Sequence, residues 1–373
     1  GPPTCQVSGT TVGGSLVITD PVVLARFGFA RTMDRIAATA QVGTADTALA
    51  LWQGWMRTFG ASPAPGDCDD VDVHGYGLTC PRVAEAKLAT LDPFPNAAAV
   101  RFEPVALVNR FDLTTGVDCG LYRIIYAMHS TSSAIGGRGF IAFDGSLPSS
   151  TPARGWDACT PVWRMWQSLS TDPDPAHRAD VLERFFYLGT AVPGFGAVVR
   201  AANYGLANGA NAEHRAGAIT TNFFVDQVEW NLRQYQLRRT CGATPGSCRV
   251  RFELTPLPST PDDSLFAGTM PMTAAARKAL ARAVRATQQF QLEAIILPAT
   301  EAWNQLESVA SSVRYDLVAS PYLRRYLGRD LNHNGTSFTL DEVLRRATTQ
   351  TCSGCHQVSG GVEQVCEVAR RST

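Results

Sequence analysis

Cys352, Cys355 and His356 form the one short segment of the 373-residue sequence whose residue types and spacing define a specific chemistry. The two thiols are separated by two residues, and the histidine follows the second thiol directly, which is the spacing of covalent haem attachment. Thiols so placed can add across the two vinyl groups of haem, and the adjacent imidazole then lies under the iron as its proximal ligand. The sequence therefore predicts that these three residues bind haem c.

This segment resembles the haem-attachment segment of c-type cytochromes over the five residues from Cys352 to His356. The resemblance implies that the chain after the motif covers the haem and supplies a distal methionine, as in a small cytochrome c. Here only Gln357 to Thr373 follow, and they include neither methionine nor histidine. We therefore expect the cover, and any sixth ligand, to come from upstream. The side chains able to be that ligand are His74, His129, His214, His333, Met270 and Met272.

Two other interpretations of the same residues stay open. Cys352, Cys355 and Cys366 can be disulfide partners, with Cys5 as a further candidate partner and His356 as a surface residue. Alternatively, the three cysteines and His356 can be the four ligands of a zinc ion. An oxidising compartment disfavours the zinc interpretation, because it does not keep thiols reduced.

A second segment, from Asp330 to Glu342, matches the pattern of a calcium loop. The residues predicted as metal ligands are Asp330, Asn332, Asn334, Thr336, Asp341 and Glu342, with Gly335 at the sixth position. The pattern departs from the usual one because position 12 is Asp341, and the glutamate arrives one residue later. The competing interpretation is an Asn-Gly turn followed by a capping box, from Thr339 to Glu342, at the start of a helix.

Other candidate sites are less specific. The stretch from Asp69 to His74 holds three carboxylates and an imidazole, which fits either a metal site or a short acidic turn. Contiguous hydrolase, zinc-protease and phosphate-loop motifs are absent. Scattered acids can pair in space for acid–base chemistry, but we expect them to be solvated or salt-bridged. They are Asp112, Asp144, Glu183, Asp226 and Glu229.

Composition and cysteine content predict an exported protein. The formal net charge is zero, which gives no electrostatic reason to expect binding to nucleic acid, and no apolar run has membrane-spanning length. Ten cysteines are too many for an ordinary cytosolic enzyme of this size. Cys68 with Cys80, and Cys241 with Cys248, are close enough in sequence to suggest disulfides, whereas Cys119 and Cys159 flank two predicted strands. We expect a periplasmic, cell-surface or extracellular protein whose leader has been removed.

The hydrophobic pattern predicts an α+β fold with a largely antiparallel sheet. Residues 1–255 are the predicted α+β domain, helical over 20–60, a loop over 61–80 and mainly strands over 100–255. Residues 256–373 are a helical region that carries the calcium loop and the CxxCH motif. The apolar stripe with Trp52 and Trp55 is interpreted as core packing. Within these regions we also expect strands at 196–201 and 230–237 and helices at 20–37, 161–169, 175–188 and 301–313.

The stretches Asn109 to Leu113 and Asp118 to Arg123 look similar to uncharacterised secreted bacterial proteins, a resemblance that implies no activity. The sequence thus favours an exported c-type haem protein that works in electron transfer or peroxidase-like chemistry with an unidentified redox partner or small-molecule substrate. The alternative is a haem-free secreted binding protein or hydrolase, stabilised by disulfides and calcium.

Overall fold

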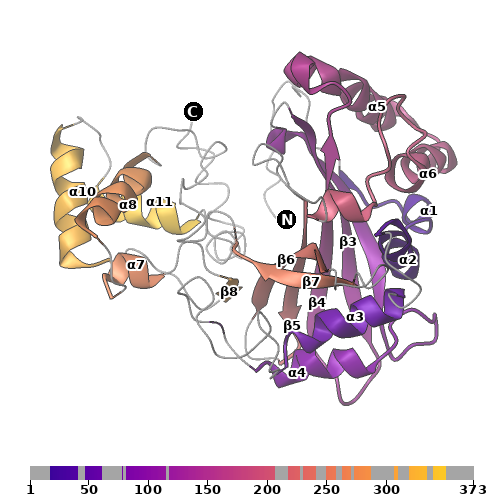
Figure 1. Ribbon diagram of the computed structural model, residues 1–373, viewed down its shortest axis with the longest axis horizontal. Coiled ribbons are helices and arrows are strands. Elements are labelled where there is room, and N and C mark those ends of the chain that lie inside the picture. The colour runs from indigo at the N-terminus through magenta and orange to yellow at the C-terminus, as the bar shows by residue number, and fades with distance from the viewer. Residues whose placement is uncertain are drawn as a thin grey trace, which may run out of the picture.

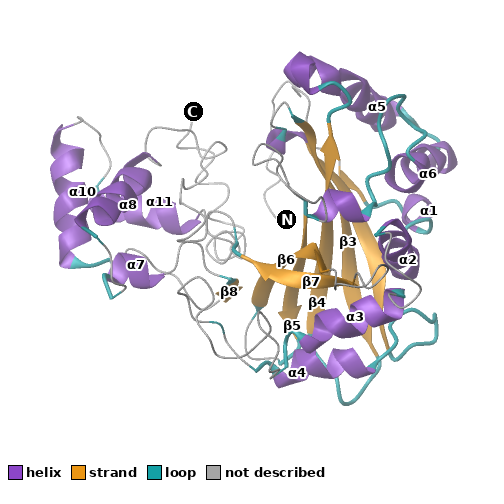
Figure 2. Ribbon diagram, viewed as in Figure 1, coloured by secondary structure: helices purple, strands orange, loops and turns teal. Residues whose placement is uncertain are grey.

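The computed structural model describes thirteen segments of the chain, and the remaining residues are drawn in grey (Figure 2). These segments are 17–40, 47–60, 78, 81–114, 117–205, 217–226, 230–240, 249–257, 263–269, 273–286, 306–309, 319–333 and 339–349.

An antiparallel sheet of eight strands lies at the centre of the described part of the chain (Figure 1). Strands β1 to β7 are neighbours in chain order, and β8 pairs with β6. Their bounds are Val17–Ile18, Val100–Arg110, Asp118–Ser130, Arg138–Pro148, Ala218–Phe224, Asn231–Thr240, Arg249–Thr255 and Glu307–Val309. The order confirms the predicted α+β class with an antiparallel sheet.

Alternation along the strands gives the sheet one core face. On β3, Tyr122, Ile124 and Tyr126 are fully buried, whereas the residues between them are half-buried. This period of two places every second side chain on the same face. On β2 the register shifts between Pro104 and Ala106, because proline has no N–H to donate to the ladder and is tolerated at a bulge.

The helices are short and surround the sheet or follow it in sequence. The helical elements before the last two strands are α1 Pro21–Leu24, α2 Phe29–Thr39, α3 Ala48–Arg57, α4 Val83–Ala86, η1 Lys87–Thr90, η2 Phe111–Leu113, η3 Pro152–Cys159, α5 Thr160–Thr171, α6 Pro175–Glu183, η4 Arg184–Leu188 and η5 Ala201–Tyr204. Those of the C-terminal region are α7 Asp263–Ala267, α8 Ala274–Ala286, α10 Pro321–His333 and α11 Leu340–Thr349.

The core between the sheet and the N-terminal helices is aromatic. The Trp55 ring on α3 stacks on Phe252 of β7 with a centroid distance of 4.3 Å, and Trp52 meets Phe102 of β2 at 5.3 Å. Both tryptophans are fully buried, which confirms that their stripe is core packing. Aromatic pairs of this kind stabilise a core beyond the area that they bury.

A second, smaller apolar core lies among the C-terminal helices. Its eleven buried residues come from α7, α8, α10, α11 and the residue Ala319 before α10, and they are leucine, alanine and valine apart from Phe266. None of them belongs to the cluster around the sheet. The described residues of the second core lie between positions 265 and 347, whereas β8, at 307–309, belongs to the sheet.

Three sequence predictions are wrong in detail. The helix expected over 20–37 is two helices, α1 and α2, because the chain turns between Ala25 and Gly28. Residues 196–201 are not a strand, since the Val198 and Val199 N–H groups donate to carbonyls of η4 instead of to a neighbouring strand. Within the helix expected over 301–313, the described residues form β8, which pairs with β6.

Candidate functional site

The predicted haem-attachment residues Cys352, Cys355 and His356 lie outside the described residues. The described element nearest to them in sequence is α11, whose last residue, Thr349, comes three positions before Cys352. The described part of this site is therefore helix α11 and the contacts that hold it in place.

Helix α11 is positioned by an apolar stripe and by a cap at its start. Val343, Leu344 and Ala347 are fully buried and belong to the core that includes side chains of α8 and α10. Ala347 follows Leu344 by three residues and Val343 by four, and these spacings place the three side chains on one helix face. The packed face therefore fixes the direction of the helix that leads to the predicted haem motif.

The described side chains of the C-terminal core are of the kind that could cover a haem, but the pocket described among them is small. Haem needs an apolar surrounding that excludes water, and the aliphatic side chains of α8, α10 and α11 provide one. The pocket against α8 and α10, lined by Leu280 and Leu323 among others, measures about 150 Å³. Pockets for molecules of cofactor size are about 300–1,000 Å³. The side chains thus fit a haem neighbour, but this pocket does not hold one.

Asp341 and Glu342, the two described acids of the predicted calcium loop, make contacts within the protein. Asp341 accepts a hydrogen bond of 2.7 Å from Arg324 of α10. The Glu342 Oε2 atom accepts from the Thr339 backbone N–H at 2.7 Å, and the Glu342 N–H donates to the Thr339 hydroxyl at 3.3 Å. This reciprocal pair is a capping box, the alternative interpretation of the segment.

The described start of the predicted calcium loop, from Asp330 to His333, is helical. Helix α10 extends to His333, so the backbone of Asp330 and Asn332 belongs to its last turn. The side chains of these two residues, and Asn334 and Thr336 altogether, lie outside the described part of the structure. Calcium binding stays a prediction, and it requires Asp341 and Glu342 to exchange their present partners for the ion.

Of the predicted sixth ligands for a haem, only His129 has a described side chain. It is exposed near the end of β3, opposite Arg101 of β2. His129 therefore belongs to the sheet and not to the C-terminal core. The side chain of His333, and His74, His214, Met270 and Met272 altogether, lie outside what the structure describes.

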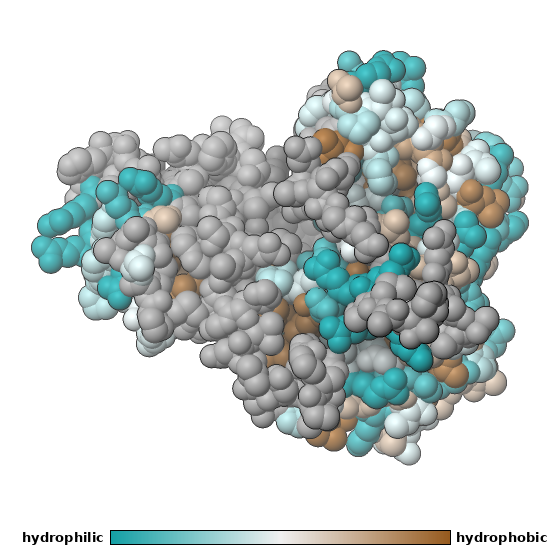
Figure 3. Space-filling model, viewed as in Figure 1, coloured by the Kyte–Doolittle hydropathy of each residue, from teal (hydrophilic) through white to brown (hydrophobic). Residues whose placement is uncertain are grey.

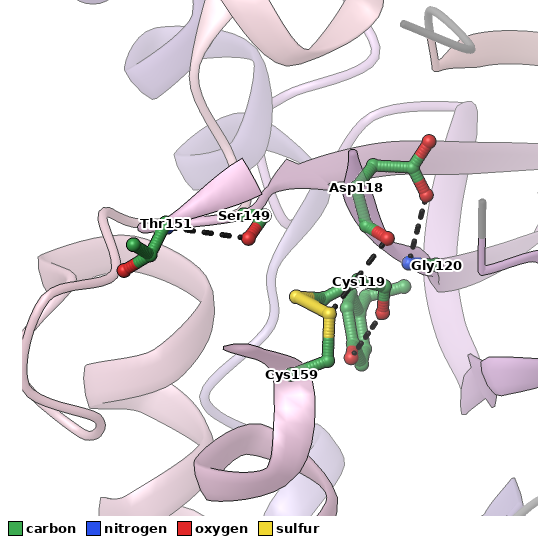
Figure 4. The surroundings of a disulfide bond; sticks show 7 residues. Asp118, Cys119, Gly120, Ser149, Thr151 and Cys159 are labelled. Atoms are coloured by element: carbon green, nitrogen blue, oxygen red, sulfur yellow. Dashed lines mark hydrogen bonds between the residues drawn. A yellow bond between two sulfur atoms is a disulfide. The ribbon is translucent and has the colours of Figure 1, made fainter. Parts of the chain in front are cut away.

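A disulfide joins Cys119 at the start of β3 to Cys159 at the end of η3 (Figure 4). Both cysteines are fully buried, and the bond closes 40 residues of chain that include β4. The sequence placed these cysteines on either side of two strands without assigning a pair. A disulfide points to an oxidising compartment. The suggested pairs Cys68–Cys80 and Cys241–Cys248 lie outside the described residues.

The acids proposed for acid–base chemistry form ion pairs where they are described. Asp144 accepts two hydrogen bonds from Arg123, at 2.6 and 2.9 Å, and Glu183 pairs with Arg31 at 2.7 Å. Asp226 pairs with Arg82, as described below. These contacts confirm the expected salt-bridged roles, whereas the side chain of Asp112 and all of Glu229 lie outside the described residues.

Sequence reasoning missed a buried carboxylate at Glu85. Its Oε1 atom accepts from Arg82 at 2.6 and 2.9 Å, and Arg82 also pairs with Asp226 at 3.0 Å. Burial raises the pKa of the Glu85 carboxyl, and the Arg82 charge opposes that shift. No sequence pattern marks this group, because Asp226 is more than a hundred residues away.

A second buried cluster joins β8 to the sheet. The Glu307 Oε2 atom accepts from Asn231 Nδ2 at 2.8 Å and from two nitrogens of Arg233, Nη2 at 3.1 Å and Nε at 3.2 Å. The Arg233 guanidinium also lies over the Phe59 ring, 4.7 Å from its centre. Since Arg233 is fully buried, the pair acts as an internal tie between the sheet and the segment that leads to the C-terminal helices.

Among the described residues, no group of three or more histidine, cysteine or acidic side chains is placed to hold a metal ion. None of the described helices is long and apolar enough to cross a membrane. No protein-family model, no curated protein and no solved structure matches this chain.

Proposed function

We propose that the protein is an exported c-type haem protein that works in electron transfer or peroxidase-like redox chemistry. Cys352 and Cys355 would hold the haem through thioether bonds, and His356 would be the proximal ligand. The single observation that carries the proposal is the spacing of these three residues. Haem, once bound, supplies the redox chemistry, whereas the protein sets the surroundings of the iron.

Two features of the structure support this proposal. Helix α11 ends just before the motif, and its buried stripe joins an aliphatic core that could shield one side of a haem. The Cys119–Cys159 disulfide fits export, and an exported location is where covalent haem attachment takes place. The sixth ligand decides between the two chemistries, because an open position permits peroxide to reach the iron and a filled one favours electron transfer.

Expression with export, in a host that carries the haem-ligation machinery, tests the proposal. We expect red protein with a Soret band and a mass increased by one haem. Cys352→Ala with Cys355→Ala should abolish the covalent haem. His356→Ala should change the spectrum, because the proximal ligand is lost. Colourless wild-type protein of unmodified mass from that host would contradict the proposal.

Calcium is the second proposed ligand, bound by the segment from Asp330 to Glu342. Calcium at 100 times its dissociation constant should stabilise the fold by about 2.7 kcal/mol, and a chelator should remove that gain. Asn334→Ala should abolish the response, whereas Thr339→Ala should cost about 1 kcal/mol with or without calcium because it removes the helix cap. An identical melting curve with calcium and with chelator would reject the calcium site.

A further inference from the structure

Three aromatic rings are in contact with one another outside the two cores. The ring of Phe140 on β4 stacks on that of Trp230, the residue before β6, with a centroid distance of 6.0 Å and an interplanar angle of 19°. Phe224 of β5 stacks on Trp230 at 5.5 Å. Hydrophobic residues on the described surface in the view of Figure 3 are scattered among hydrophilic ones, and single exposed residues of this kind are ordinary. A contiguous group of rings is not ordinary, so it indicates a function.

The strand register places these rings on the face of the sheet opposite to the core. Phe223 of β5 is fully buried and packs against Phe59 with a centroid distance of 5.8 Å. Successive side chains of a strand point to opposite faces, so Asn222 and Phe224 point away from that core. Phe140 is the cross-strand partner of Asn222 and therefore shares their face. It is 39% exposed, so part of its ring is open to a ligand.

Arg138 adds a positive charge to the rings. It is the cross-strand partner of Phe224, and its guanidinium carbon lies 5.9 Å from the centre of the Phe224 ring and 6.0 Å from that of Trp230. Gly137 permits this approach, because it has a φ of 85° and a Cβ there would collide with the Phe224 carbonyl oxygen. Among the described residues, no carboxylate forms an ion pair with Arg138, which is exposed. Its N–H donors are therefore available to an anionic ligand.

Stabilisation of the sheet accounts for only part of this arrangement. Aromatic cross-strand pairs stabilise neighbouring strands, which suits the contact between Phe224 and Trp230. Phe140 and Trp230, however, belong to strands that β5 separates, and Phe140 exposes more of its ring than a packing role requires. The side chains that continue this face along β5 and β6 are polar and half-exposed, namely Asn222, Thr220 and Gln234. Rings beside amides and a hydroxyl suit a ligand that has both apolar faces and hydroxyl groups.

We propose that Phe140, Trp230 and Arg138 bind a polysaccharide that contains uronic acids. The C–H groups on the face of a sugar ring carry partial positive charge, which the negative face of an aromatic ring attracts. The planar fork of Arg138 binds a carboxylate through two hydrogen bonds, and the Asn222 amide both donates to and accepts from hydroxyls. The formal net charge of zero argues against nucleic acid as the ligand. This binding site is independent of the proposed haem.

The test of stacking is the binding of a labelled oligomer of galacturonic acid to the full chain, measured by fluorescence anisotropy at low salt. The methyl ester of the same oligomer is the uncharged ligand for comparison. Phe140→Ala should weaken both ligands about fivefold, because the stacking surface is lost. Phe140→Leu should do the same while it keeps an apolar side chain in place. Trp156→Ala, which removes a 55% exposed ring of η3, should change either affinity less than about twofold.

The test of charge is Arg138→Gln, which should weaken the acidic oligomer about tenfold and leave the ester unchanged. Arg154→Gln removes the same charge from an exposed position of η3 and should affect neither ligand. The proposal is overturned if the acidic oligomer fails to bind, if Phe140→Ala and Trp156→Ala weaken it equally, or if Arg138→Gln weakens the ester as much as the acid. Tighter binding of single-stranded DNA than of the oligomer would overturn it in favour of a nucleic acid.

Discussion

The core around the sheet and the core of the C-terminal helices are built from different side chains. Among the described residues, the first packs tryptophan, phenylalanine and tyrosine rings between eight strands and the N-terminal helices, whereas the second gathers eleven mostly aliphatic residues from four helices and one flanking alanine. The described part of the second core would supply little stability by itself, and small units commonly depend on a metal, a covalent link or a cofactor. We therefore expect the sheet to be stable without a ligand, and the helices before the CxxCH motif to gain stability from a bound haem or calcium ion.

Mutation of the buried pair of Arg233 and Glu307 should lower the free energy of unfolding most, because this pair links the sheet to the segment that precedes the last two helices. Arg233→Leu leaves the Glu307 carboxylate buried without its charge partner and should lower the free energy of unfolding by about 3–5 kcal/mol. Replacing both residues with leucine should recover most of that loss, since a buried ion pair is often no better than apolar packing. Urea unfolding measures both variants; equal losses for the single and the double variant would show that the charge pair does not matter.

Truncating one residue in each core tests whether the two regions unfold independently. Trp55→Ala should cost about 3–5 kcal/mol and Leu344→Ala about 2–5 kcal/mol, since each leaves a cavity. Hydrogen exchange should show that Trp55→Ala exposes amides of β3 and β4, whereas Leu344→Ala exposes those of α8 and α10 and leaves the sheet protected. Loss of protection in both regions from either variant would mean that they unfold as one unit.

The disulfide joins two segments of the sheet region, so its removal should destabilise that region. Cys119→Ala with Cys159→Ala should lower the free energy of unfolding by about 2–5 kcal/mol, because the unfolded chain gains freedom when the loop is opened. The melting temperature in the absence of reductant measures the effect. A wild-type protein that reacts fully with thiol reagents at these positions when unfolded without reductant would contradict both the bond and an oxidising destination.

Substitution of Glu85 should change the free energy of unfolding least, and the size of this change should depend on pH. Burial raises the pKa of Glu85 in the folded state above 4.5. The protonated carboxyl therefore stabilises the fold at low pH, and this stabilisation is lost as the pH rises through the folded-state pKa. Glu85→Gln should therefore gain stability relative to the wild type as the pH increases from below 4.5 towards neutrality. Unfolding curves measured along this range test the sign, and a Gln variant that loses relative stability on the same path would show that the Arg82 contact outweighs burial.

The sequence predicted what local periodicity determines. The antiparallel sheet and the core packing of the Trp52 and Trp55 stripe both correspond to structure. The sequence-based prediction failed where contacts between residues far apart in the chain determine the secondary structure. Residues 307–309 form a strand, in which Glu307 pairs with Arg233, and residues 196–201 donate hydrogen bonds to η4. The chemistry of the CxxCH motif, in contrast, is read from spacing alone.

The most direct test of the proposed function is mass spectrometry of the tryptic fragment between Arg346 and Arg370, taken from exported protein made with the haem-ligation machinery. This fragment holds Cys352, Cys355 and Cys366. We predict that it carries one covalent haem that survives acid-acetone extraction, with Cys352 and Cys355 both modified. A fragment of unmodified mass, or one in which Cys352 or Cys355 is joined to another cysteine, would contradict the proposal.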